Sequence, residues 1–100
     1  MPVSYQILYW RDIPAQVKVR SGKERSARPL GPRFQAAIDE AAMAAGLSQS
    51  DDYLAQWSAS EWTEHEGEAQ TVAEALAAEL EREYTDERLQ TLAAQGGRKR

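Results

Sequence analysis

Two runs of alternating residues near the start of the chain constrain the fold most strongly. Residues 3–9 and 15–19 place apolar side chains at every second position, namely Val3, Tyr5, Ile7, Tyr9, Ala15, Val17 and Val19. A period of two is typical of β-strands that turn one face to the core. The segment between the runs, Arg-Asp-Ile-Pro at residues 11–14, favours a turn, because Asp accepts backbone N–H groups and Pro fixes φ. The two runs therefore predict a β-hairpin.

Other extended segments have weaker patterns. Leu8 and Trp10 make the even face of the first strand partly apolar, which indicates that both faces are covered near its end. Residues 24–30 are expected to be a short extended piece. Residues 58–64 are predicted as a third strand, with a bulge that shifts the phase of its apolar positions.

Helical spacing recurs in the rest of the chain. Pro32 opens a first helix, because Pro suits the first helical position, and Gly46 with Leu47 predicts a Schellman ending. Ser48 is expected to cap a short second helix. An apolar stripe over residues 69–84 predicts a third helix with acidic residues on its other side, and the Thr-Asp pair after it favours a short last helix.

The order strand, strand, helix, helix, strand, helix predicts an α+β fold. We expect a small, mainly antiparallel three-stranded sheet with helices packed on one face. Residues 1–95 are predicted to form a single domain. Residues 96–100, Gly-Gly-Arg-Lys-Arg, are predicted to be a disordered basic tail.

Composition narrows the class of protein. The chain has 100 residues and no cysteine, which excludes disulfides and thiolate chemistry and fits a reducing compartment. No basic-then-apolar leader and no apolar run of about 20 residues is present, so we expect a cytoplasmic protein without a membrane span. The net charge is −4, yet Lys and Arg dominate residues 1–34 while Asp and Glu dominate residues 35–97. We expect a basic sheet and acidic helices that partly neutralise each other.

No catalytic constellation is recognisable. The single histidine, His65, stands among Glu61, Glu64 and Glu66, but one imidazole with carboxylates is a poor zinc site. Phosphate loops, dinucleotide fingerprints and nucleophile elbows are missing from the sequence. We therefore expect a protein that is not itself an enzyme and that needs no cofactor.

Three binding hypotheses remain open. The first is a protein partner that contacts the hairpin through Trp10, Arg11 and Asp12, with Arg20 nearby, since Trp and Arg dominate binding hot spots. The second is an anion- or RNA-binding module that uses the basic side chains Lys18, Lys23, Arg25 and Arg28 together with Arg20. The acidic pI, near 5.0, disfavours a nucleic-acid duplex. In the third, His65 or Arg11 completes the active site of a partner enzyme.

Several ordered blocks also carry a family resemblance. They are YWRDIPAQV near the start, then PRFQAAIDEAAMAAG, then DDYLAQW, then a Trp-Thr-Glu segment before a final acidic helix. Over residues 3–84 the chain resembles small bacterial proteins and C-terminal domains of the virulence factor family. The resemblance implies an accessory or regulatory protein without assigned catalytic residues. It also suggests an association with folate and corrinoid one-carbon enzymes.

Overall fold

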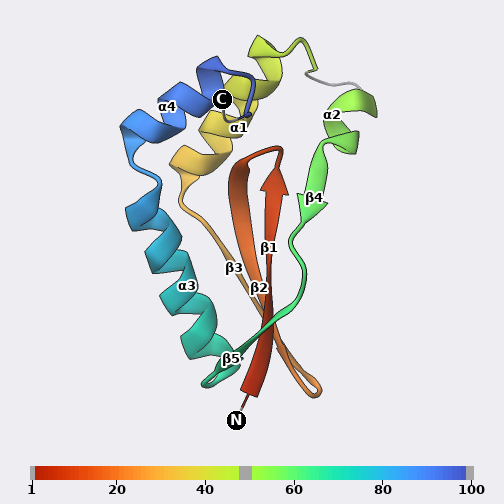
Figure 1. The fold of residues 1–100 in the computed structure, drawn as a ribbon, viewed down its shortest axis with the longest axis vertical. Helices are drawn as coiled ribbons and strands as arrows, with labels where there is room; N and C mark the ends of the chain where they lie inside the picture. The colour runs from red at the N-terminus through yellow and green to blue at the C-terminus, as the bar shows by residue number, and fades with distance from the viewer. Residues whose placement is uncertain (1, 48–50, 99–100) are drawn as a thin grey trace.

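The computed structural model of the protein describes residues 2–47 and 51–98, which form one antiparallel sheet with helices against one face (Figure 1). The strands are β1 (Pro2–Trp10), β2 (Ile13–Ser21), β3 (Glu24–Pro29), β4 (Trp57–Ala59) and β5 (Thr63–Glu66). The helices are α1 (Pro32–Ala44), α2 (Asp51–Ala55), α3 (Ala69–Glu83) and α4 (Asp86–Ala94). The predicted α+β class is confirmed, but the sheet has five strands where three were expected.

The predicted hairpin forms the centre of the sheet. Strands β1 and β2 pair from Ser4 and Arg20 at one end to Trp10 and Ile13 at the tip. The register shifts by one residue at Leu8/Tyr9, so Ala15 is left as an extra residue in β2. Such a bulge increases the local twist and re-aims the end of a hairpin. Trp10 and Ile13, which pair at the tip beyond this bulge, are both wholly buried.

The two further strand predictions need correction. The expected short extended piece is a full strand, β3, paired with β2 along its whole length. The expected third strand is divided into β4 and β5, which pair with different halves of β1. Between these two halves β1 advances three residues, from Tyr5 to Leu8, while the partner segment covers four, from Ala59 to Thr63. The extra residue is the predicted phase shift, and the Ser60 hydroxyl accepts the Ile7 N–H at the break.

The predicted helix signals are confirmed where the structure describes them. Pro32 is the first residue of α1. After the end of this helix, Gly46 has φ 72°, and the Leu47 N–H donates to the Ala42 carbonyl, as in the predicted Schellman ending. Thr85 caps α4 through a hydrogen bond from the Arg88 N–H. The expected cap Ser48 lies outside the described residues.

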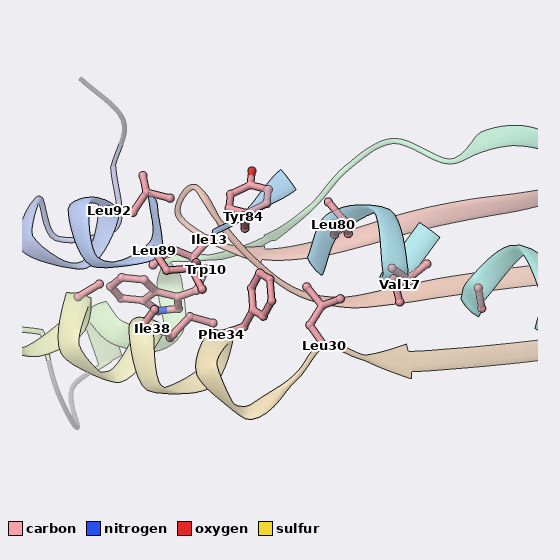
Figure 2. Close-up of a cluster of buried hydrophobic side chains, with 14 of the residues drawn as sticks. Trp10, Ile13, Val17, Leu30, Phe34, Ile38, Leu80, Tyr84, Leu89 and Leu92 are labelled. Atoms are coloured by element: carbon pink, nitrogen blue, oxygen red, sulfur yellow. The ribbon is translucent and has the colours of Figure 1, made fainter. Parts of the chain in front are cut away.

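The core lies between the sheet and the helices. Helix α3 packs on β2 and β3, and α1 packs on α4 and β2. Figure 2 shows Trp10 between α1 and α4, close to Ile38, while Val17 lies nearer to α3. The buried side chains include Val17, Val19, Phe34, Ile38, Ala41, Val72, Leu80, Leu89 and Leu92. No helix in the described part of the chain is long and apolar enough to cross a membrane.

The first two residues of the expected basic tail pack against the hairpin tip. Gly96 and Gly97 are buried, and the Gly97 carbonyl accepts the Asp12 N–H at 2.8 Å. Glycine permits this close approach, because a Cβ atom at Gly97 would lie 2.9 Å from the Trp10 ring. Arg98 is exposed, and the last two residues lie outside the described ranges.

Candidate partner-binding surface

Trp10 is a core residue. Its exposed fraction is 0%, its indole N–H donates to the Tyr53 carbonyl at 3.0 Å, and its ring lies 5.5 Å from the Tyr53 ring. A partner therefore has no access to the indole. The hypothesis of a contact surface centred on Trp10 is wrong for this residue, because the tip of the hairpin is enclosed by α1, α2 and the chain after α4.

Arg11 and Asp12 connect the hairpin tip to the rest of the fold. The Arg11 guanidinium donates to the Gln56 side chain and to the Gly96 carbonyl, both at 3.0 Å, and lies 5.3 Å from the Trp10 ring. Arg11 also has φ 53°, a left-handed conformation that is unusual for a residue with a side chain. Both Arg11 and Asp12 are only half-exposed. The hydrogen bonds of Arg11 and Asp12 hold the hairpin tip against residues 56 and 96–97 of the same chain.

Arg20 lies far from this tip. It pairs with Ser4 at the other end of the hairpin, roughly 20 Å along β2 from Ile13. The structure therefore does not bring Arg20 together with Trp10, Arg11 and Asp12. It places Arg20 instead among residues of the second hypothesis.

Three cations gather on the face of the sheet that points away from the core. Val17 and Val19 of β2 are buried, so the alternating residues Lys18 and Arg20 point to the opposite, open face. Arg25 of β3 lies directly opposite Arg20, on the same face. All three side chains are exposed. We call Lys18, Arg20 and Arg25 the cationic face.

The other two predicted cations lie elsewhere. Arg28 is opposite Val17, so it points to the helix side of the sheet, where its guanidinium lies 3.6 Å from the Glu74 carboxylate. Lys23 is in the exposed turn between β2 and β3. The register of β3 thus separates Arg25 from Arg28, although both belong to the same basic segment.

Trp62 lies beside the cationic face, in contact with Arg20. It lies in the segment between β4 and β5, half-buried, with the Arg20 guanidinium 4.0 Å from its ring centroid. A cation stacked this way gains electrostatic attraction from the ring face. A groove of about 340 Å³ runs beside the pair, lined by Gln6, Lys18, Arg20, Arg25, Ala27 and Trp62. The sequence signal was the tryptophan that fits neither strand nor helix period in residues 57–66.

The positive charges of this surface are not balanced locally. Within residues 2–47 and 51–98, none of the three cations lies within 4.0 Å of a carboxylate. Two acids of β5, Glu64 and Glu66, lie on the same face. Ser4 pairs with Glu64 on one side and with Arg20 on the other, so the Cα atoms of Glu64 and Arg20 are roughly 10 Å apart. Like charges directly opposite each other on neighbouring strands cost up to about 1 kcal/mol. Arg20 and Arg25 pay this cost in the free protein.

A second hollow, of about 260 Å³, lies near the hairpin tip and is lined by Tyr9, Arg11, Asp12 and Tyr84. Burial raises the pKa of the Tyr9 hydroxyl, and the neighbouring Tyr84 raises it further. Burial also raises the pKa of Tyr84, against the opposing effect of Arg88. Both hydroxyls are therefore neutral hydrogen-bonding groups near pH 7.

His65 lies on β5, where it pairs with Val3. Its Nδ1 is 2.8 Å from the Glu66 carbonyl and its ring meets Tyr5 edge-on. The neighbouring Glu64 and Glu66 alternate to the other face of the strand. Among the described residues, no three side chains of the types that bind metals come together.

Residues 8–93 match the family model described as Virulence factor. The chain belongs to the virulence factor family. The matched range contains the hairpin tip, the cationic face and Trp62, and it confirms the resemblance that the ordered sequence blocks indicated. Comparison with curated proteins gave no match, and comparison with solved structures gave none.

Proposed function

We propose that this virulence factor protein is a non-catalytic accessory or regulatory protein that binds an acidic segment of a protein partner on its cationic face. The observation that carries the proposal is the unbalanced cluster of Lys18, Arg20 and Arg25 beside Trp62. An anionic side chain placed between Arg20 and Arg25 relieves their repulsion. The positive charges of this surface repel each other in the free protein and are stabilised when an acidic partner binds.

The dimensions of the surface favour a peptide segment over a large polyanion. The groove has a volume of about 340 Å³ and is bounded by Trp62, and Glu64 and Glu66 of β5 lie on the same face of the sheet. The molecule as a whole is acidic, with a net charge of −4, which repels a nucleic-acid duplex or any extended polyanion. A segment with a few carboxylates meets the three cations without approaching the acidic helices.

Peptide binding tests the proposal. The probe is a fluorescent peptide of about eight residues that alternates Glu and Thr, matched to a short strand. We expect binding to the wild-type protein at low salt. The double variant Arg20→Gln/Arg25→Gln should weaken it about tenfold or more, since hydrogen bonds to charged groups are among the strongest.

The matched control is Arg82→Gln/Arg98→Gln, which removes the same charge from exposed residues outside the cationic face. It should change affinity by no more than about twofold, because exposed charges at a distance are screened by salt. A wild-type protein that does not bind the peptide, or equal losses in both double variants, would overturn the proposal.

Single-stranded RNA is a second candidate, because an aromatic side chain beside cations can stack a base and hold its phosphates. An RNA oligonucleotide of about eight nucleotides is the competing probe. RNA that binds more tightly than the acidic peptide, and whose binding is lost in Trp62→Ala, would replace the first candidate. RNA that does not displace the peptide supports the first.

The family resemblance extends the proposal to a class of partner, the folate and corrinoid one-carbon enzymes. Binding of a purified one-carbon enzyme subunit to the wild-type protein, and its loss in Arg20→Gln/Arg25→Gln, would support this class. Absence of binding removes the class of partner and leaves the cationic face as the proposed surface.

A further inference from the structure

We infer that the acidic segment binds as an additional β-strand along the free edge of β3. The inference rests on the proposed function and adds the mode of docking to it. Strand β3 is the last in the sheet order and pairs with β2 alone among the described strands. Its residues Glu24–Pro29 are exposed except for the half-buried Ser26. Its outer row of backbone N–H and C=O groups is the part of the sheet that a further strand can use.

This edge carries charged side chains and a terminal proline, which limit strand addition, but it has no bulge. Bulges and prolines are common protections of edge strands. The pairing of β3 with β2 runs without a register shift from Ser21 and Glu24 to Gln16 and Pro29, so β3 contains no bulge. Its proline is the last residue, which leaves the N–H groups of the preceding residues in place. The Leu30 N–H donates to the Ala15 carbonyl of β2, so by alternation the N–H groups of Arg25 and Ala27 point to the free edge and can pair with an added strand.

The charge of the edge selects the partner. Arg25 and Arg28 lie on β3, with Lys23 in the turn before it. Two copies of this strand placed edge to edge would bring the arginines of both copies to one edge, with Glu24 as the acid of each strand, and this excess of positive charge disfavours self-association. An acidic strand in the same place meets opposite charges. The edge therefore discriminates against a second copy of the chain and in favour of an anionic segment.

The added strand would have one row of side chains on the open face of the sheet and one row on the helix side. Side chains on the open face lie beside Arg25 and Ala27 and reach the groove that contains Arg20. Side chains on the other face lie beside Arg28, whose charge is already paired with Glu74. Near the start of β3, side chains on this face also lie beside a hollow of about 320 Å³, which is lined by Glu24, Arg25, Ser26, Ala69 and Gln70. The segment is thus predicted to carry acids at alternate positions, all on the open face.

Backbone N-methylation of the peptide separates strand addition from simple charge attraction. Two modified peptides of alternating Glu and Thr are compared with the unmodified one, with methyl groups on every Glu nitrogen or on every Thr nitrogen. All three carry the same charge. In an added strand only alternate N–H groups point at the edge. One modified peptide should therefore bind about tenfold or more weakly, and the other within about threefold of the unmodified peptide.

Each result decides a different point. Two modified peptides that bind equally, whether both well or both poorly, contradict strand addition. If both bind well, the acidic segment docks through side chains only, and the proposed function stands. If the unmodified peptide does not bind, the proposed function itself fails.

Two arginines of β3 provide a test on the protein side. Arg25→Gln should weaken binding of the unmodified peptide by about fivefold or more, because it removes a charge-assisted contact on the open face. Arg28→Gln is the matched control on the same strand and should change affinity by less than about twofold, since Arg28 points to the helix side. Equal losses in the two variants would contradict the predicted placement of the acids.

Discussion

At the residue scale, the hairpin tip shows how a sequence neighbourhood can mislead. Trp10 and Arg11 stand side by side in the sequence like an exposed hot spot. In the fold the indole is enclosed, and the guanidinium ties the tip to Gln56 and Gly96. Two of the segments that enclose the tip, at Tyr53 and Gly96, lie more than forty and more than eighty residues further along the chain. No local pattern around residues 9–12 contains that information.

The contact between Gly97 and Trp10 gives a prediction at this scale. A Cβ atom on Gly97 would lie 2.9 Å from the Trp10 ring, and Gly97 has φ +88°. Gly97→Ala should therefore lower the free energy of unfolding by roughly 2–3 kcal/mol, from the steric clash and the strained backbone together. Urea denaturation followed by circular dichroism measures the change.

Gly22 is the matched control. It also has a positive φ, +57°, but a Cβ atom there meets nothing within 4 Å. Gly22→Ala should cost only the backbone strain, about 1 kcal/mol. A loss at Gly97 no larger than that at Gly22 would mean that the chain after α4 does not pack on the indole.

At the scale of elements, patterns with a strong period were predicted correctly. The hairpin alternates clearly, and α1, α3 and α4 carry helical stripes with recognisable starts and ends. Strand β3 was underestimated, because its residues Glu24–Pro29 bury no side chain fully and so show no alternation. Its extended form comes from pairing with β2. Strands β4 and β5 have three and four residues, too few for a period to show.

The junction between the hairpin and the end of α3 gives a pH prediction. Burial raises the pKa values of Tyr9 and Tyr84 above the ordinary tyrosine value of 10.0. The unfolded chain therefore loses these protons at a lower pH than the folded protein does. The stabilisation is complete below about pH 10 and is lost as the pH rises through and beyond that value.

Urea denaturation at a series of pH values from neutral to alkaline measures this effect. The free energy of unfolding of the wild type should fall steeply above about pH 10. In Tyr9→Phe/Tyr84→Phe the fall should be shallower, since the remaining titrating groups are common to both proteins. Parallel curves for the two proteins would show that these hydroxyls do not couple to folding.

At the scale of the whole molecule, the charge separation in the sequence has two outcomes. On the helix side the expected neutralisation is found, because Arg28 pairs with Glu74 and Arg33 pairs with Glu81 and Asp86. On the open face Lys18, Arg20 and Arg25 have no such partner among the described residues. The sequence shows which residues are basic. It did not predict which face each would take, because that depends on the register of β3 against β2.

Trp62 shows the same limit for the candidate surface. Its place next to Arg20 depends on the extra residue between β4 and β5, which sets how this segment follows β1. The sequence indicated a phase shift in this region, but not the side chain that the shift brings against the cations. The positive charge of Lys18, Arg20 and Arg25 could therefore be read from the sequence. That they share one face with Trp62 follows only from the pairing of the strands.

The central claim is that a partner binds the cationic face and not the hairpin tip. A nuclear magnetic resonance titration of the isotope-labelled protein with the acidic peptide tests it most directly. The three tryptophans give three indole N–H signals, with Trp10 at the tip and Trp62 at the cationic face. We predict shifts of the Trp62 indole and of the backbone amides of residues 18–20 and 25–27, with the Trp10 indole unchanged. Shifts confined to Trp10 and residues 9–12, or no shifts at all, would contradict the account.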